Sequence, residues 1–161
     1  MLVVWIGCQI LGAWLYGHIM EWVLHKHVLH RFGTSNNHIL SFHFQEHHRN
    51  SRKNEFYDSI YERFRWDAGG KELLALWLLN IAHLPLITVA PWFVLTNMIS
   101  SFHYHRVHKR AHLDPAWAKV HVPWHYDHHM GKNQHANWGV RSDVIDRVMG
   151  TRIVYTTVER R

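Results

Sequence analysis

The sequence predicts an all-helical integral membrane protein with a histidine-rich metal site, and three observations support that prediction. All 18 Lys and Arg residues lie within 25–71 and 103–161, so 1–24 and 72–102 carry no basic side chain. Both of those stretches are strongly apolar, as membrane segments are. Histidine makes up 18 of the 161 residues and gathers beside the apolar stretches. A chain of this length fits one domain, which we place at 1–161.

The first apolar stretch, 1–24, is long enough for one transmembrane helix. Only Gln9, His18 and Glu21 interrupt it. A cleaved signal peptide is the alternative, but the stretch lacks a basic start and runs directly into a histidine cluster. We therefore predict a retained N-terminal helix.

The second apolar stretch, 72–102, predicts a helical hairpin. It is longer than the roughly 20 residues that one crossing needs and shorter than the roughly 40 needed for two. A single crossing would separate the histidines after residue 102 from those in 25–71 by a whole bilayer. A turn between Pro85 and Pro91 keeps them together. The arms of this hairpin are short, so either they stop before the far surface of the membrane or the helices extend past the stretch into 69–71 and 103–108. Because basic residues favour the cytoplasmic side, we place the histidine clusters and both polar blocks there.

The polar segment 54–66 predicts an amphipathic helix. Phe56, Ile60, Tyr61 and Phe64 fall near helical spacing. Such a face either lies on the membrane surface or packs against the core of the protein.

The formal charge of +6 raises the question of nucleic-acid binding. The basic residues are scattered through the polar blocks without a nucleic-acid motif, so attraction to anionic lipid explains the charge more simply. We expect no nucleic-acid partner. Cys8 is the only cysteine, which excludes an intrachain disulfide and a cysteine-rich zinc or iron–sulfur site.

Four histidine clusters lie outside the apolar stretches. They are HKHVLH (25–30), HFQEHH (43–48), HYHRVHKRAH (103–112) and HYDHH (125–129). Residues three or four apart share one face of an α-helix, so His125, His128 and His129 can face one ion. His25 and His30 are five apart, about 140° around an α-helix, and converge only where the helix is distorted.

The clustered imidazoles outnumber the ligands that one metal ion can take, so the working model is two metal ions. Imidazole suits iron, copper, nickel and zinc. Structural zinc sites normally include cysteine ligands, whereas histidines with an oxygen bridge fit iron, a redox metal able to activate dioxygen. We expect two iron ions, which zinc can replace in a purified sample. Glu21, Glu46 and Asp127 lie in or beside the clusters, where each either orients a histidine ring or is a solvated charge.

These clusters occur with two further motifs. The opening MEWVLHKHVLH (20–30) has the form Glu-x-x-x-His-x-x-x-x-His, and the closing NWGVRSDVIDRVMGT (137–151) contains Asn-aromatic-Gly and Asp-Arg-x-x-Gly-Thr. Together the motifs resemble the membrane-bound fatty acid hydroxylase/sterol desaturase superfamily, which includes carotene hydroxylase-like members and consists of helical, histidine-rich lipid oxidases. The likeness covers nearly the whole chain, and it implies that HANWGV (135–140) braces the metal-bearing helix.

Two departures from the family pattern affect the ligands. HFQEHH is one residue longer than the common HxxHH, so His38 is an alternative to His43. In the third cluster His103 and His108 fit the spacing of bacterial carotene hydroxylases, with His105 and His112 as possible substitutes. The resemblance implies that the metals are bound by His25, His30, His43, His47, His48, His103, His108, His125, His128 and His129.

The resemblance also implies an enzyme that uses dioxygen to hydroxylate or desaturate an unactivated C–H bond of a membrane lipid, such as a fatty acyl chain, a sterol or a carotenoid. The sequence shows no dinucleotide-binding glycine motif, so we expect an external electron donor such as a ferredoxin or a cytochrome. No organic cofactor site is indicated, nor any catalytic residue beyond the metal ligands.

Two other classes of function stay open. A catalytically inactive metal-binding subunit of a larger membrane assembly would keep the same fold and metals. A membrane metal transporter would need polar ligands at mid-membrane depth, where only His18, His83 and a few amides lie.

Overall fold

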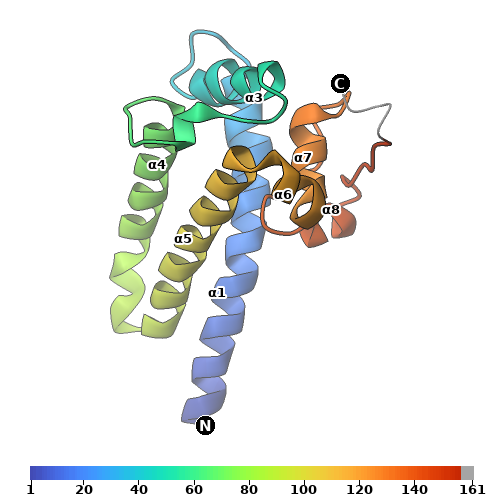
Figure 1. Cartoon of the computed structure of the whole chain (residues 1–161). Coiled ribbons are helices and arrows are strands. Elements are labelled where there is room, and N and C mark those ends of the chain that lie inside the picture. The colour runs from blue at the N-terminus through green and yellow to red at the C-terminus, as the bar shows by residue number, and fades with distance from the viewer. Residues whose placement is uncertain (157–161) are drawn as a thin grey trace.

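Three long helices stand side by side and position the rest of the protein. The computed structural model describes residues 1–156, and within them it is all-helical without a β-strand. Helix α1 (Leu2–Leu24) packs along α5 (Pro91–Leu113), which packs against α4 (Ala68–His83). In Figure 1 the N-terminus and the turn between α4 and α5 lie at the lower end, and the shorter helices gather around the upper end.

The hairpin forms where the prolines predict it. The 3-10 turn η4 (Leu84–Thr88) has Pro85 near its start, and Pro91 is at the first turn of α5, where a missing N–H costs nothing. Asp67 caps α4 by accepting a hydrogen bond from the backbone N–H of Gly69. Both arms extend beyond 72–102, which is one of the two predicted alternatives, and they bring the histidine clusters to one end of the molecule.

The long helices carry most of the exposed apolar surface. Two helical segments, Leu2–Gly33 and Ala68–Thr88, are long and apolar enough to cross a membrane. Large hydrophobic side chains such as Leu11, Trp77 and Ile99 stand exposed along α1, α4 and α5. Extensive exposed apolar surface of this kind marks a site of contact with a membrane or with another protein.

Two short π-helices carry the first two histidine clusters. The first, η1 (His25–His30), joins α1 to α2 (Arg31–Gly33), and the second, η2 (His43–His48), leads into α3 (Arg49–Lys53). The distortion that the spacing of His25 and His30 requires is therefore a π-helix.

The prediction of an amphipathic helix over 54–66 is wrong. Only a single 3-10 turn, η3 (Ser59–Tyr61), forms there, because the buried Asp58 side chain accepts the N–H of Ile60 and starts a turn instead. Phe56 adopts φ 83°, outside the helical region, and is fully buried. Phe64 is exposed, so the four apolar residues do not form one face.

The C-terminal third folds back over the upper ends of the long helices. It contains α6 (Pro115–His121), α7 (Pro123–Met130) and α8 (Val144–Val148), shown in gold to red in Figure 1. Six buried side chains from this region, α5 and the 54–66 segment form a small core: Phe56, Ala111, Ala118, Val122, Tyr126 and Met130. This core holds α7, whose last six residues are all buried, against the histidine-bearing π-helices.

Candidate metal centre

Eight buried histidines form two groups of four in the described part of the chain. In each group the four ring nitrogens that can bind a metal lie within 4.8 Å of one another. The first group consists of His25, His30, His48 and His128, and the second of His47, His108, His112 and His129. Four neutral imidazoles at such distances are a sufficient ligand set for one transition-metal ion in each group.

Adjacent residues link the two groups. His47 and His48 are neighbours on η2 but enter different groups, and His128 and His129 do the same on α7. The rings of His48 and His129 stack with their centroids 4.2 Å apart. The two groups are therefore contiguous, as a dinuclear site requires.

The π-helices explain how histidines five residues apart reach one site. A π-helix closes hydrogen bonds between residues i and i+5, so such residues come to lie one above the other. His25 and His30 on η1 have their rings 5.0 Å apart, and His43 and His48 on η2 have theirs 4.9 Å apart. The single-residue expansion of HFQEHH thus keeps His43 beside the first group.

Backbone carbonyls fix the orientation of three rings. The Nδ1–H of His25 donates to the carbonyl of Trp138 (2.7 Å), that of His128 to Ala136 (2.6 Å) and that of His112 to Phe56 (2.9 Å). A ring that donates from Nδ1 keeps a lone pair on Nε2, the form that binds a metal.

Two carboxylates, the fully buried Asp58 and the partly buried Glu72, orient rings of the second group. Asp58 accepts from Nδ1 of His47 (2.9 Å), and Glu72 accepts from Nδ1 of His108 (2.9 Å). Glu72 also accepts from the hydroxyl of Tyr61 (2.6 Å). Sequence reasoning missed both carboxylates, although an acidic residue at the start of an apolar helix, as Glu72 is, marks a charge that needs a partner.

The ligand nitrogens of the first group lie close enough together to share one cation. Nε2 of His128 lies 3.1 Å from that of His30 and 3.2 Å from that of His48, and its own proton is on Nδ1. Two nitrogens each about 2.1 Å from one ion and at right angles would be about 3.0 Å apart. The spacing therefore fits a shared metal ion.

Burial keeps these histidine rings neutral, and several of their ring nitrogens have no hydrogen-bond partner. Removal from water lowers the pKa of His47, His48, His128 and His129 well below the ordinary value. Within residues 1–156, Nε2 of His47 and both ring nitrogens of His129 have no hydrogen-bond partner although they are buried. Unpaired buried nitrogens are costly, and a bound cation would satisfy them.

The structure places the other predicted ligands in different positions. His43 and His125 lie beside the groups, with Nε2 atoms 3.1 Å from those of His25 and His112, respectively. His103 is exposed and belongs to neither group, whereas its possible substitute His112 is a member of the second. Helix α5 is a regular α-helix, so His103 points about 140° away from His108, while His112, four residues on, shares its face.

The predicted carboxylates contact other groups. Glu21 binds Arg141 (2.7 Å), Glu46 binds Lys71 (3.1 Å), and Asp127 binds Arg152 (3.1 Å). Within residues 1–156 the histidine rings donate instead to the carboxylates of Asp58 and Glu72.

The bracing segment 136–141, which overlaps the predicted brace HANWGV (135–140), contacts the first histidine group through the carbonyls of Trp138 and Ala136. Asn137 has φ 60°, a left-handed conformation that Asn tolerates. The turn that follows is held because Asp146 accepts the N–H groups of Trp138 (2.9 Å) and Gly139 (2.8 Å). A Cβ at position 139 would lie 2.0 Å from the carbonyl oxygen of Ser142, so only glycine fits there. The brace presents the carbonyls that hold His25 and His128.

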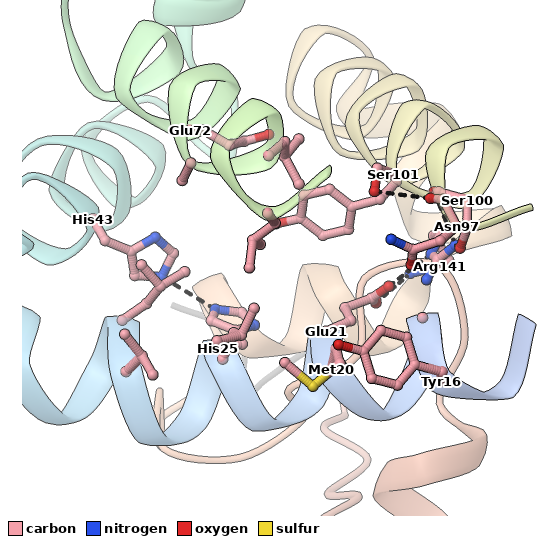
Figure 2. Close-up of a pocket in the computed structure, with 18 of the residues that line it drawn as sticks. Tyr16, Met20, Glu21, His25, His43, Glu72, Asn97, Ser100, Ser101 and Arg141 are labelled. Carbon is pink, nitrogen blue, oxygen red and sulfur yellow. Dashed lines mark hydrogen bonds and ion pairs between the residues drawn. The ribbon is translucent and has the colours of Figure 1, made fainter. Parts of the chain in front are cut away.

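A cavity of about 270 Å³ adjoins the first group. It lies between α1, α4 and α5 and is lined largely by apolar side chains such as Met20, Leu24 and Leu76. Figure 2 shows His25 and His43 at one end of this cavity and Asn97, Ser100 and Arg141 at the other. An apolar chain in the cavity would thus approach the histidines from between the membrane-length helices.

Comparison of the chain with models of protein families, with curated proteins and with solved structures finds no match.

Proposed function

We propose that this protein is a membrane oxygenase that uses two iron ions to hydroxylate or desaturate an unactivated C–H bond of a lipid. The observation that supports this proposal best is the contact between the first histidine group and the apolar cavity, through His25. The resemblance of the sequence motifs to the fatty acid hydroxylase/sterol desaturase superfamily points to the same chemistry.

The donor set favours a redox metal over a structural one. Eight neutral imidazoles in two contiguous groups offer no thiolate, and the first group faces a cavity rather than closed protein. Bound iron would supply the reduction of dioxygen. Hydroxylation consumes RH, O₂, two electrons and two protons and yields ROH and water, whereas desaturation yields an alkene and two waters.

The chain's own residues contribute binding, orientation and exclusion of water. Asp58, Glu72 and the carbonyls of 136–138 hold the histidine rings in their metal-binding tautomers. Met20, Leu24 and Leu76 surround the cavity with apolar groups, which favours a hydrocarbon chain and disfavours bulk water. We propose that electrons come from a separate ferredoxin or cytochrome that docks on the cytoplasmic side.

The test combines oxygen uptake with product analysis. Protein expressed with added iron is purified in detergent and supplied with a reduced ferredoxin and lipid extracts. We expect reductant-dependent oxygen consumption and a lipid that gains one oxygen or loses two hydrogens. Replacing His128 and His129 with alanine should abolish both signals, because each group then loses one ligand.

The matched control is the double variant His103→Ala and His121→Ala, which removes two exposed histidines outside the groups. It should retain the wild-type activity. Full metal loading together with no oxidation of any lipid, and a stoichiometric partner protein, would instead identify an inactive subunit of a larger assembly.

A further inference from the structure

The cavity has a polar end that the proposed metal chemistry does not use. Opposite His25 and His43, the wall of the cavity carries amide, hydroxyl and guanidinium groups (Figure 2). These come from α1, from α5 and from the bracing segment: Tyr16, Asn97, Ser100, Ser101 and Arg141. Buried polar side chains next to a membrane-length helix are costly, so they mark a candidate functional site.

Asn97 is the most informative of these residues. It is 6% exposed, and its amide is directed into the cavity (Figure 2). Its side chain has no hydrogen bond within residues 1–156, whereas its backbone carbonyl accepts from the hydroxyl of Ser101 (3.0 Å). A buried amide with both a donor and an acceptor unused suits a ligand hydroxyl or carbonyl.

The charge at this end favours an uncharged ligand group. Among the described residues, Arg141 is the only Lys or Arg that lines the cavity. Its Nε donates to Glu21 at 2.7 Å in a pair whose side chains are at most 4% exposed. Another nitrogen of the same guanidinium donates to the hydroxyl of Ser100 (2.6 Å). Because Glu21 already neutralises this cation, a ligand carboxylate would face a second buried anion without a free positive partner.

The helix geometry sets the distance between the two ends. Gly17 packs against Ser100 so closely that a Cβ at position 17 would lie 2.5 Å from the Ser100 hydroxyl oxygen. His25 is eight residues further along the same helical segment, which corresponds to roughly 12 Å at 1.5 Å per residue. The polar end and the histidines are therefore separated by the length of a medium hydrocarbon chain.

We propose that Asn97 and Ser101 form a subsite for an uncharged oxygen, so that the substrate is a lipid already bearing a hydroxyl or carbonyl roughly 12 Å from the carbon that reaches His25. The statement about the substrate rests on the proposed oxygenase function. The subsite itself does not, because it is defined by the unpaired amide of Asn97 and the neutralised Arg141.

Binding of three ten-carbon probes tests the subsite without turnover. Radiolabelled decan-1-ol, decane and decanoate are equilibrated with metal-loaded protein in phosphatidylcholine nanodiscs, and binding is corrected with protein-free discs. We expect wild-type protein to bind decan-1-ol on the order of tenfold more tightly than decane, the effect of a net hydrogen bond, and more tightly than decanoate.

Substitutions at the polar end of the cavity test whether these residues cause the preference for decan-1-ol over decane. Asn97→Leu should reduce the ratio of decan-1-ol to decane affinity to about one while decane still binds, and Ser101→Ala should reduce it in part. Met20→Leu, an apolar change in the same cavity, should leave the ratio unchanged. Equal binding of alcohol and alkane to the wild type, tighter binding of decanoate, or an unchanged ratio in both Asn97→Leu and Ser101→Ala would overturn the proposal.

Oxygen uptake measured on the same samples separates this inference from the proposed function. A clear preference for decan-1-ol in protein that oxidises no lipid would defeat the oxygenase proposal alone. Lipid oxidation without that preference would defeat the subsite alone.

Discussion

At the scale of single residues, the group that accepts a hydrogen bond from Nδ1 of a histidine decides which ring nitrogen is left to bind a metal. His47 and His108 donate to carboxylates, whereas His25, His112 and His128 donate to backbone carbonyls. All five rings thereby direct Nε2 toward their groups. A carboxylate partner also makes the ring more basic, so its removal should weaken metal binding even though no ligand is lost.

Replacing Asp58 with asparagine tests this role. The amide nearly preserves the shape but removes the charge beside His47, so we expect metal affinity to fall roughly tenfold to a hundredfold. Competition with a chelator, followed by metal analysis, measures the change. Glu55→Gln alters an exposed acidic residue nearby and should have no effect. Equal chelator resistance in Asp58→Asn and wild-type protein would show that the hydrogen bond does not support the metal.

At the scale of elements, much of the architecture is readable from the sequence. The distribution of basic residues and the two prolines predict α1 and the hairpin of α4 and α5, because apolar length and φ restriction are local properties. The π-helices could not be located from local sequence. We attribute the i to i+5 hydrogen bonds of η1 to the packing of His25 and His30 against the other histidine clusters.

The choice of His112 over His103 follows from the same reasoning. A five-residue separation works on η1 and η2, which are π-helices, but not on α5, which is regular. On this regular helix the structure groups His108 with His112, whereas His103 lies outside both groups. Asp58 gave no sequence signal, because the segment around it has the spacing of an amphipathic helix that does not form.

Inserting one alanine between His27 and Val28 tests the role of η1. The insertion changes the separation of His25 and His30 from five to six residues, so the two rings no longer lie one above the other on the π-helix. The first group should then lose its metal while the second keeps its own, so metal per chain should fall by half. The same insertion between Val3 and Val4, at the exposed start of α1, should leave the metal content unchanged. If both insertion variants bound as much metal per chain as the wild type, η1 would not be needed to form the first group.

At the scale of the whole molecule, the buried histidines make stability depend on pH. Their environment excludes water, so burial lowers the pKa of seven rings well below the ordinary 6.5: His43, His47, His48, His112, His125, His128 and His129. Below pH 6.5 the unfolded chain binds more protons at these sites than the folded chain does. The free energy of unfolding must therefore decrease as pH falls. Burial raises the pKa of Asp58 to about 6, which acts in the opposite sense but is a single group.

Metal-free protein in detergent should accordingly unfold at a lower temperature at pH 5.5 than at pH 7.5. Bound metal should raise the unfolding temperature at pH 7.5, because it binds the folded state, and its effect should shrink at pH 5.5 as protons compete for the imidazoles. Circular dichroism during heating, with and without chelator, gives all four values. An unfolding temperature that is independent of pH, or higher at pH 5.5, would show that the rings are not buried as neutral groups.

The most direct test of the two-metal centre is the ratio of metal to chain in protein expressed with iron, measured by elemental analysis for the wild type and for His128→Ala and His129→Ala separately. Because each of these residues belongs to one group of four, we predict two metal ions per wild-type chain and about one in each variant. A wild-type ratio of one or less, or variants that retain the full wild-type amount, would contradict the dinuclear centre on which the proposed lipid oxidation depends.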